Sequence, residues 1–413
     1  MIISSIIFVY FITFLAIFVQ VFFLVTFLER KREIIRREEK IELGVYPGVT
    51  IVVPCWNEEN TIQRTVLSLL DLDYPKEKLQ LFLIDDGSTD NTLKVLKEFE
   101  TYSNIKVFHK ENGGKHTAVN LGLENNTNDF FGCLDADSFV HPEALKRIIT
   151  YFDNPEVMAV APSIIIHKPK NFVQYAQKAE YEMAVYIKKM LGFLDAIHVT
   201  PGPFSIFRKT VFDKIGNYRK AHNTEDMEIA YRMQSHRYKI EQCNDAYVYT
   251  VAPDTIKKLF KQRVRWIYGF INNTLDYKRL ILRPKYGNFA LFTIPSGVIS
   301  ISAALYLFTD NVGNIFNKGI EKFTQASVTG LDFGFNLPHL NWFYMNTETS
   351  AILIFILFGL LIISMILGSQ MANGRVRFSL NIFYFIAIYS VVAPFWLLKA
   401  VYNTVFSKTP SWR

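Results

Sequence analysis

Long apolar runs without charge constrain this chain more than any other feature. Residues 2–28 contain no charged side chain, and about 20 such residues in a helix cross the hydrocarbon core of a membrane. Three more apolar runs, at residues 289–308, 351–368 and about 380–401, lie toward the C-terminal end. The pattern predicts one membrane helix, a large polar region, and then three membrane helices.

The first run could instead belong to a signal peptide. A signal peptide has a shorter apolar region, positive charge before it, and a small-residue cleavage site after it. Here the basic residues Arg30, Lys31 and Arg32 follow the run. We therefore expect an uncleaved transmembrane helix over residues 1–30.

Basic residues beside the apolar runs predict the orientation. Lys and Arg gather just after the first run and at residues 278–285, and the short loop 370–378 holds two arginines. The loop 309–350 has two lysines against four acidic residues. Cytoplasmic loops are enriched in Lys and Arg. We therefore expect the polar region in the cytoplasm of a plasma-membrane protein, with the 309–350 loop and both termini outside.

The polar region alternates short apolar strands with helices. The expected strands are residues 49–54, 79–84, 105–109 and 130–134, and the expected helices are 60–70, 91–98 and 115–123. This alternation is typical of a doubly wound α/β sheet, which binds ligands beyond the carboxyl ends of its strands. We expect this domain over residues 31–253, interfacial helices over 254–287, and the last three membrane helices within 288–413. The three cysteines all fall in the cytoplasmic part, where thiols stay reduced.

Two acidic clusters follow expected strands. Asp85 and Asp86 precede Gly87 and Ser88, and such residues are also common in turns and helix caps. Asp135 and Asp137 flank a single alanine. Two carboxylates so placed can face a cation such as Mg²⁺ or Mn²⁺ and bridge it to phosphate oxygens, although Asp-x-Asp is also frequent in loops.

Two further motifs lie at expected helix starts. Gly113 and Gly114 precede Lys115, and this arrangement can direct backbone amides and an ammonium toward a diphosphate. An ordinary loop is the alternative. Glu225 and Asp226 follow a threonine, and their simplest role is to cap a helix and complement its dipole.

The last motif lies in a basic amphipathic segment before the second apolar run. Gln262, Arg265 and Trp266 form a Gln-x-x-Arg-Trp sequence there. A basic amphipathic helix next to a membrane span is typically interfacial, and Trp266 could be a headgroup-level anchor.

The order of these motifs resembles the processive family-2 glycosyltransferases. That family includes cellulose, chitin, hyaluronan and bacterial poly-N-acetylglucosamine synthases. The resemblance covers residues 49–275 in motif, and the short C-terminal layout is most similar to poly-N-acetylglucosamine synthases. It implies a GT-A fold and a UDP-linked sugar donor. It also implies that residues 171–190 form another interfacial helix, where an ordinary surface helix is the alternative.

The same resemblance assigns roles to the donor side of the site. A metal ion, Mg²⁺ or Mn²⁺, would bind Asp135 and Asp137, with Asp137 as the direct ligand. The residues implied to bind the donor are Pro54, Trp56, Glu58, Asp85, Asp86, Lys115, Asp135, Gln262 and Arg265.

On the acceptor side, the resemblance implies that Gly202, Pro203 and Ser205 form a loop beside the acceptor. Trp266 would present a flat face to the acceptor sugar. Asp226, with Glu225 beside it, would be the catalytic base, because the attacking hydroxyl must lose a proton. In-line attack would invert the anomeric carbon and give a β-linked product.

We expect a synthase that extends a β-linked amino-sugar polymer, which the resemblance implies is poly-N-acetylglucosamine, and that exports the polymer between its own helices. A non-processive enzyme that adds one sugar to a lipid acceptor would share most motifs, and a hyaluronan- or chitin-type synthase is a further alternative. A scaffold would require loss of the base or metal motif, and both are present. The expected partners are the UDP-sugar, the growing glycan or lipid acceptor, and membrane lipids. Whether an accessory membrane subunit joins them is left open by the sequence. No nucleic-acid partner is expected, because the net charge of +7 lies mainly beside the membrane runs.

Overall fold

The computed structural model describes residues 2–39, 43–329, 349–375 and 379–410. Its centre is an eight-stranded sheet with the order β3-β2-β1-β4-β7-β6-β8-β5. The strands are β1 (Val49–Cys55), β2 (Leu79–Asp86), β3 (Ile105–Lys110), β4 (Phe130–Cys133), β5 (Phe139–Val140), β6 (Val157–Ile166), β7 (Ile206–Arg208) and β8 (Lys239–Thr250). The four strands expected from the sequence are confirmed.

The sheet is mixed and not parallel throughout. β3, β2, β1 and β4 are parallel neighbours, so their carboxyl ends meet at one edge, where Cys55 pairs with Asp85 and Asp85 with His109. β7 joins β4 antiparallel. At this join the Ile206 side chain packs over Gly132, where an added Cβ would lie 2.4 Å from Cδ1 of Ile206.

Helices cover both faces of the sheet. The cluster on one face takes side chains from α2 (Ile62–Leu70), α3 (Thr92–Lys97) and α5 (Ala144–Ile149). The cluster on the other face takes them from α4 (Lys115–Glu124), α6 (Phe172–Phe193), α7 (Lys209–Ile215) and α8 (Glu225–Ser235). Cys55, Cys133 and Cys243 are buried free thiols within these layers.

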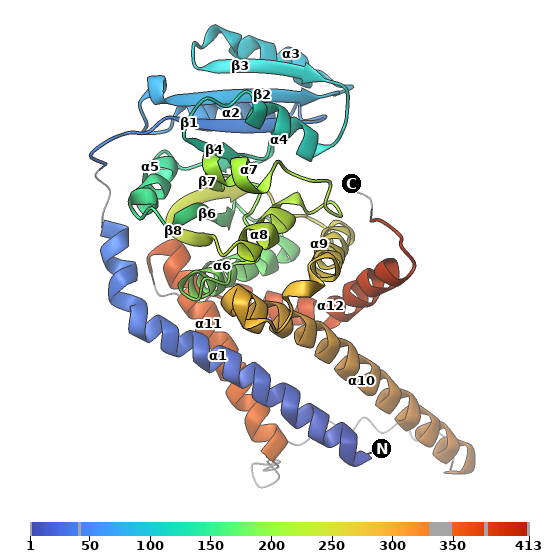
Figure 1. The fold of residues 1–413 in the computed structure, drawn as a ribbon. Helices are drawn as coiled ribbons and strands as arrows, with labels where there is room; N and C mark the ends of the chain where they lie inside the picture. The colour runs from blue at the N-terminus through green and yellow to red at the C-terminus, as the bar shows by residue number, and fades with distance from the viewer. Residues whose placement is uncertain (1, 40–42, 330–348, 376–378, 411–413) are drawn as a thin grey trace.

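Four helices in the described part of the chain are long and apolar enough to cross a membrane. They are α1 (Ile2–Glu39), α10 (Ile294–Thr329), α11 (Thr349–Asn373) and α12 (Asn381–Val405). The expected count of one N-terminal and three C-terminal helices is confirmed. In Figure 1, α1, α10 and α11 extend away from the sheet, while α6 and α9 (Ile256–Asp276) lie between the sheet and these helices.

Helix α10 is longer than its apolar run. The loop expected at residues 309–350 begins instead as helix, which continues to Thr329. Apolar side chains such as Val312, Ile315 and Phe323 recur at near-helical spacing there and are exposed, so the amphipathic pattern carries the helix past the uncharged segment. Residues 330–348 of the expected loop lie outside the described part of the chain.

Helix α12 stays beside the domain along its whole length. Ile382 near its start packs in one cluster with Ala179 of α6. Near its end, Thr404 Oγ1 accepts a hydrogen bond of 3.1 Å from Asn272 of α9. After the helix, the Pro410 carbonyl accepts one of 3.1 Å from Asn223. One face of α12 therefore packs on α6 and α9, which composition alone does not reveal. The end of α12 lies beside the domain, and the side of the membrane that each terminus occupies stays a prediction.

Candidate active site

A cleft of about 1050 Å³ opens at the carboxyl ends of the parallel strands. Strand ends, the starts of α4 and α8, and helices α6 and α9 contribute its walls. Most residues expected at the site line this cleft: Pro54, Trp56, Glu58, Asp86, Lys115, Asp135, Asp137, Pro203, Glu225, Asp226, Gln262, Arg265 and Trp266. Gly202 and Ser205 line a small adjoining pocket that also contains Lys115 and Asp226.

Among the expected site residues, Asp85 lines neither the cleft nor the adjoining pocket. Neighbouring side chains on a strand point to opposite faces, so only one of the Asp85–Asp86 pair can face the ligand. Asp85 is fully buried and its Oδ2 lies 2.7 Å from Nδ1 of His109. Asp86 accepts hydrogen bonds from the backbone of Gly113 (3.0 Å) and Gly114 (2.9 Å). Asp86 therefore holds the glycine loop in place and forms part of the cleft wall.

Lys115 ties the two acidic motifs together at the start of α4. Its Nζ lies 2.6 Å from Asp135 Oδ1 and 3.0 Å from Glu225 Oε1. Burial by itself would lower the pKa of Lys115, but these two carboxylates outweigh it and hold that pKa well above its usual value. A Cβ on Gly202 would lie 2.4 Å from Lys115 Nζ, so a larger residue here would displace the ammonium from its present position.

Asp226 lies in the first turn of α8. Its Oδ1 accepts a hydrogen bond of 2.9 Å from the Met227 backbone. Burial, and then the neighbouring Glu225 charge, raise the pKa of Asp226 from 3.8 to about 6, against the opposing effect of Lys115. For Glu225, burial would raise the pKa, but Lys115 outweighs it and the net shift is downward. The two adjacent carboxylates therefore differ, with Glu225 bound to Lys115 and Asp226 left as the weaker acid.

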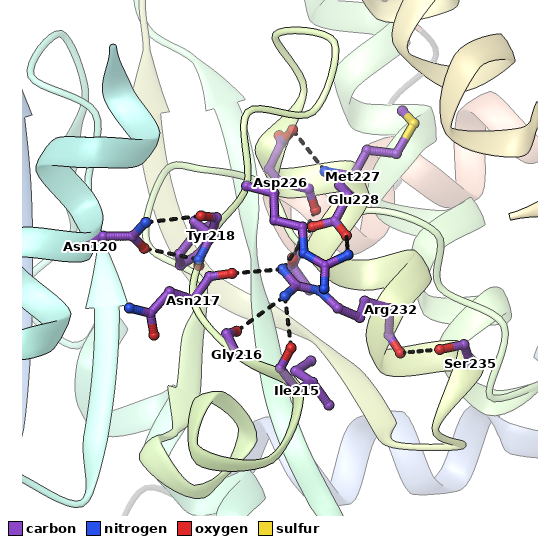
Figure 2. Close-up of polar contacts among 12 residues, drawn as sticks. Asn120, Ile215, Gly216, Asn217, Tyr218, Asp226, Met227, Glu228, Arg232 and Ser235 are labelled. Carbon is purple, nitrogen blue, oxygen red and sulfur yellow. Dashed lines mark hydrogen bonds and ion pairs between the residues drawn. The ribbon is translucent and has the colours of Figure 1, made fainter. Parts of the chain in front are cut away.

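Behind Asp226, an arginine that is ion-paired within α8 anchors this helix to the preceding loop (Figure 2). Glu228 Oε2 accepts a bond of 2.8 Å from Arg232 Nη2. The guanidinium of Arg232 also donates to three backbone carbonyls, those of Ile215 (2.8 Å), Gly216 (3.3 Å) and Asn217 (3.0 Å). These contacts fix the helix that carries Asp226.

The same loop is fastened to α4. The Tyr218 backbone N–H donates to Asn120 Oδ1, and Asn120 Nδ2 donates to the Tyr218 carbonyl, each at 2.9 Å. Because α4 begins at Lys115, this pair of bonds links the two helices whose first turns meet in the cleft. Sequence reasoning missed this support; only the i, i+4 spacing of Glu228 and Arg232 hinted at it.

Asp135 and Asp137 fit a divalent cation. Burial, then the charges of Asp135 and Glu58, raise the pKa of Asp137 to about 6, so a cation would relieve crowding of like charges. The described residues contain no group of three His, Cys, Asp or Glu side chains that could hold a metal by themselves. A cation bound here would therefore need further oxygen ligands from a bound diphosphate or from water.

Helix α9 presents the Gln-x-x-Arg-Trp side chains to the cleft. Arg265 Nη1 donates a bond of 3.0 Å to the Asn223 carbonyl, in the loop before α8. Gln262 Oε1 is buried and has no hydrogen-bond partner among the described residues. A buried carbonyl oxygen without a donor is costly, so a ligand hydroxyl or amide would satisfy it.

Lys188 of α6 lines the cleft and was not assigned by sequence reasoning. Within the described chain it makes no hydrogen bond or ion pair. Burial lowers its pKa to about 8, and Asp226 acts in the opposite direction. Its position inside the amphipathic stretch expected at residues 171–190 was the only signal in the sequence.

Known proteins resemble this chain in part of its sequence and in its fold. Residues 50–216 match the model described as glycosyl transferase family 2. The chain is 32% identical over 225 residues to a poly-beta-1,6-N-acetyl-D-glucosamine synthase of Staphylococcus epidermidis, over 54% of each chain. It is 29% identical over 267 residues to the synthase of the same name from Staphylococcus aureus strain MSSA476, over 63% of this chain and 64% of that one. The chain thus matches little more than half the length of these curated relatives.

One solved structure resembles nearly the whole chain. It is the mannosyltransferase PcManGT of Pyrobaculum calidifontis in complex with GDP-Man and Mn²⁺, with a TM-score of 0.54 and 16% identity, covering 96% of this chain and 99% of that one. At this identity the likeness shows the fold alone, and the expected GT-A fold is confirmed. Residues 50–216 therefore resemble a family 2 glycosyltransferase domain, and the chain has a GT-A-like fold.

Proposed function

We propose that this chain is an inverting membrane glycosyltransferase that transfers N-acetylglucosamine from UDP-N-acetylglucosamine to a growing β-linked glycan. The relatives named as poly-beta-1,6-N-acetyl-D-glucosamine synthases support the choice of sugar. The observation that carries the proposal is a single cleft shared by Asp226, the Asp135–Asp137 pair and Trp266. A base, a carboxylate pair that can hold a cation against the diphosphate, and an aromatic face for the sugar are what sugar transfer from a diphosphate requires.

The donor would lie along the strand ends. Trp56 lines the cleft beside β1 and could stack on the uracil, while Asp86 could accept bonds from the nucleoside. Lys115 and Arg265 would face the diphosphate, whose charge grows as the sugar leaves. Bound at Asp135 and Asp137, Mg²⁺ or Mn²⁺ would supply further positive charge to the leaving diphosphate.

Asp226 would be the general base. A carboxylate with a pKa of about 6 is ionised at neutral pH, yet it is more basic than an ordinary aspartate. It would take the proton of the attacking acceptor hydroxyl as that oxygen bonds to the anomeric carbon and the diphosphate departs with the electron pair. Attack from the face opposite the leaving group gives the β-linked product from an α-linked donor.

The apolar helices would place this chemistry at a membrane. We propose a multi-pass plasma-membrane protein with a cytoplasmic catalytic domain, in agreement with the basic segments beside α1 and before α10. The growing glycan would leave along the helices that extend from the domain, with or without an accessory subunit.

A second candidate is transfer of one sugar to a lipid acceptor that carries an anionic group. The observation that favours it is Lys188, a cation without a partner among the described residues, in the cleft that contains Asp226. A phosphate or carboxylate on the acceptor would pair with it. A neutral amino-sugar polymer would offer it only hydroxyl and amide groups.

The test is UDP release by the full chain, purified and reconstituted in lipid vesicles with Mn²⁺ or Mg²⁺. The donor panel is UDP-N-acetylglucosamine, UDP-glucose and UDP-glucuronate, and Asp226→Asn is the control for non-enzymatic release. Products are separated by size and their linkage is determined.

A polymer formed from UDP-N-acetylglucosamine alone supports the synthase. A single-sugar lipid product whose formation is lost in Lys188→Met supports the second candidate. If no donor yields UDP above the Asp226→Asn control, both candidates are wrong.

A further inference from the structure

A buried polar cluster joins three helices beside the cleft. Arg263 of α9 and Glu180 of α6 form an ion pair, with Nη2 2.5 Å from Oε2. The Tyr389 hydroxyl of α12 donates to the same Glu180 oxygen at 2.5 Å and accepts a bond of 3.2 Å from Arg263 Nη2. One carboxylate oxygen therefore holds an arginine and a tyrosine that are far apart in the sequence.

The guanidinium of this cluster lies against Trp266. Arg263 Cζ is 4.2 Å from the centre of the Trp266 ring. Residues three apart on a helix are neighbours on one face, and a cation within about 6 Å of an indole face is attracted to it. Arg263 is only 5% exposed, so this contact is shielded from water. Trp266 lines the cleft, whereas Arg263 does not.

The charge on Arg263 is secured by its neighbours. Burial alone would lower the pKa of the guanidinium, but Glu180 and then Tyr389 outweigh it and the net shift is upward. Arg263 Nε has no partner among the described residues, so Nη2 makes the contacts that orient the group. The plane of the guanidinium depends on these two partners, and the plane determines how its face meets the indole.

We propose that Arg263, oriented by Glu180 and Tyr389, is a positioning residue that sets the ring of Trp266 for the acceptor, and that α12 thereby acts on the acceptor end of the cleft. The acceptor role of Trp266 rests on the function proposed above. The positioning of its ring does not, because it follows from contacts that need no substrate.

Two aromatic side chains of the same helix, α12, hold the ring of Tyr389 in place. Its ring packs on Phe385, with centroids 4.5 Å apart, and on Trp396 at 5.3 Å. A shift of α12 along α6 would move the hydroxyl away from Glu180 and release the guanidinium. The cluster thus connects an apolar helix to the cleft through one hydroxyl group.

Tyr389→Phe is the sharpest variant, because it removes that hydroxyl and keeps the ring. Tyr384→Phe is the matched control, since Tyr384 lies on the same helix and is 43% exposed. Its ring contacts Tyr175, and its hydroxyl makes no hydrogen bond within the described residues. Arg263→Lys keeps the charge but loses the planar group that can bond and stack at once. Gel filtration and thermal unfolding establish that each variant is folded.

The first measurement needs no substrate. The fluorescence of Trp266 is isolated as the difference between each protein and the same protein carrying Trp266→Phe. We expect Tyr389→Phe and Arg263→Lys to shift this component to longer wavelength and to increase its quenching by acrylamide, while Tyr384→Phe leaves it unchanged.

The second measurement separates acceptor use from donor use. Loss of one hydrogen bond to a charged group predicts about a fivefold or larger rise in acceptor KM for Tyr389→Phe. Hydrolysis of UDP-N-acetylglucosamine without acceptor should remain close to that of the unmodified protein.

Two results would overturn the proposal. One is a Trp266 signal that is the same in Tyr389→Phe, Arg263→Lys and the unmodified protein. The other is an equal loss of hydrolysis and transfer, which would indicate a general structural role. If the unmodified protein releases no UDP from any donor, the proposed function fails, and the fluorescence result alone then decides the positioning role.

Discussion

Lys115 Nζ lies 2.6 Å from Asp135 Oδ1, so a lysine occupies one carboxylate of the pair expected to bind a divalent cation. The same ammonium lies 3.0 Å from Glu225, next to the expected base. Lys115 thus lies between the expected cation-binding pair and the expected catalytic base. When a diphosphate and a cation enter, the ammonium can turn from Asp135 to the phosphate oxygens, and the carboxylate can turn to the cation.

This relationship leads to a prediction about metal binding. We expect Lys115→Met to bind Mn²⁺ more tightly than the unmodified protein in the absence of nucleotide, because Asp135 loses its competing cation. The same variant should bind UDP more weakly, since it lacks a charge that faces the diphosphate. Calorimetric titration with Mn²⁺, and then with UDP, measures both. Lys170→Met, at an exposed position away from the cleft, is the control; weaker Mn²⁺ binding by Lys115→Met would contradict the competition.

A second prediction concerns pH. Because Asp226 must be ionised to accept a proton and its pKa is raised to about 6, kcat/KM should rise with pH through about 6 and level off above it. Asp137 also has a raised pKa of about 6. The contributions of Asp226 and Asp137 are distinguished by measuring kcat/KM against pH at increasing concentrations of Mn²⁺. A midpoint that stays fixed assigns the acid limb to Asp226, and one that falls with Mn²⁺ assigns it to Asp137.

Removal of the Asp226 charge should have opposite effects on activity and stability. We expect Asp226→Asn to lower turnover by about 10² to 10⁴, the usual contribution of a general base. The raised pKa means that the folded state binds a proton more readily than the unfolded state does, so stability falls as pH rises from about 4 through about 6. Asp226→Asn should therefore raise the unfolding temperature at pH 8 and much less at pH 5. An unchanged unfolding temperature at pH 8 would show that burial of the ionised Asp226 carboxylate does not destabilise the folded protein.

The anchor behind Asp226 can be tested by one substitution. Arg232→Met leaves Glu228 without its 2.8 Å partner and three backbone carbonyls without a donor. Breaking a buried ion pair typically costs about 3–5 kcal/mol, so the unfolding temperature should drop clearly. Arg219→Met is the matched control, because Arg219 is exposed and lies 3.8 Å from the same glutamate. Equal unfolding temperatures for the two variants would contradict the assigned role.

The placement of α12 predicts which side of the membrane its end occupies. Since the Pro410 carbonyl accepts a bond from Asn223 of the domain, Ser407→Cys should be labelled by an impermeant maleimide under the same conditions as Lys97→Cys in the domain. Asn317→Cys, in the extension of α10, should be labelled under the opposite conditions. The three native cysteines are buried and give little background. Labelling of Ser407→Cys together with Asn317→Cys would instead support a C-terminal end on the far side.

Strands β1 to β4 were predicted from the sequence, whereas β5 to β8 were not. β6 is itself an apolar run, VMAVAPSIII, that was not assigned. Strands β1 to β4 are short apolar runs separated by helices, a pattern visible in local sequence. β7 has three residues, and β8 mixes polar and apolar side chains in KIEQCNDAYVYT. Such strands form because distant partners pair with them, so their own residues carry little signal.

Part of the candidate site was likewise predictable from the sequence, and part was not. The motifs placed Lys115, Asp135, Asp226 and Trp266 in one region correctly, because strand ends and helix starts of an α/β sheet meet at one edge. The motif reading did not separate Asp85 from Asp86. Strand alternation turns one toward His109 and the other toward the cleft.

By itself, the sequence determined the apolar helices, the strand–helix alternation and the residue types of the site, because each depends on neighbours along the chain. Only the tertiary structure decided that Lys115 binds Asp135 and Glu225, that Glu180 joins Arg263 to Tyr389, and that α12 returns to the domain. These contacts connect residues on different elements. They arise when buried charges and apolar faces find partners during packing, and periodicity along one element does not specify those partners.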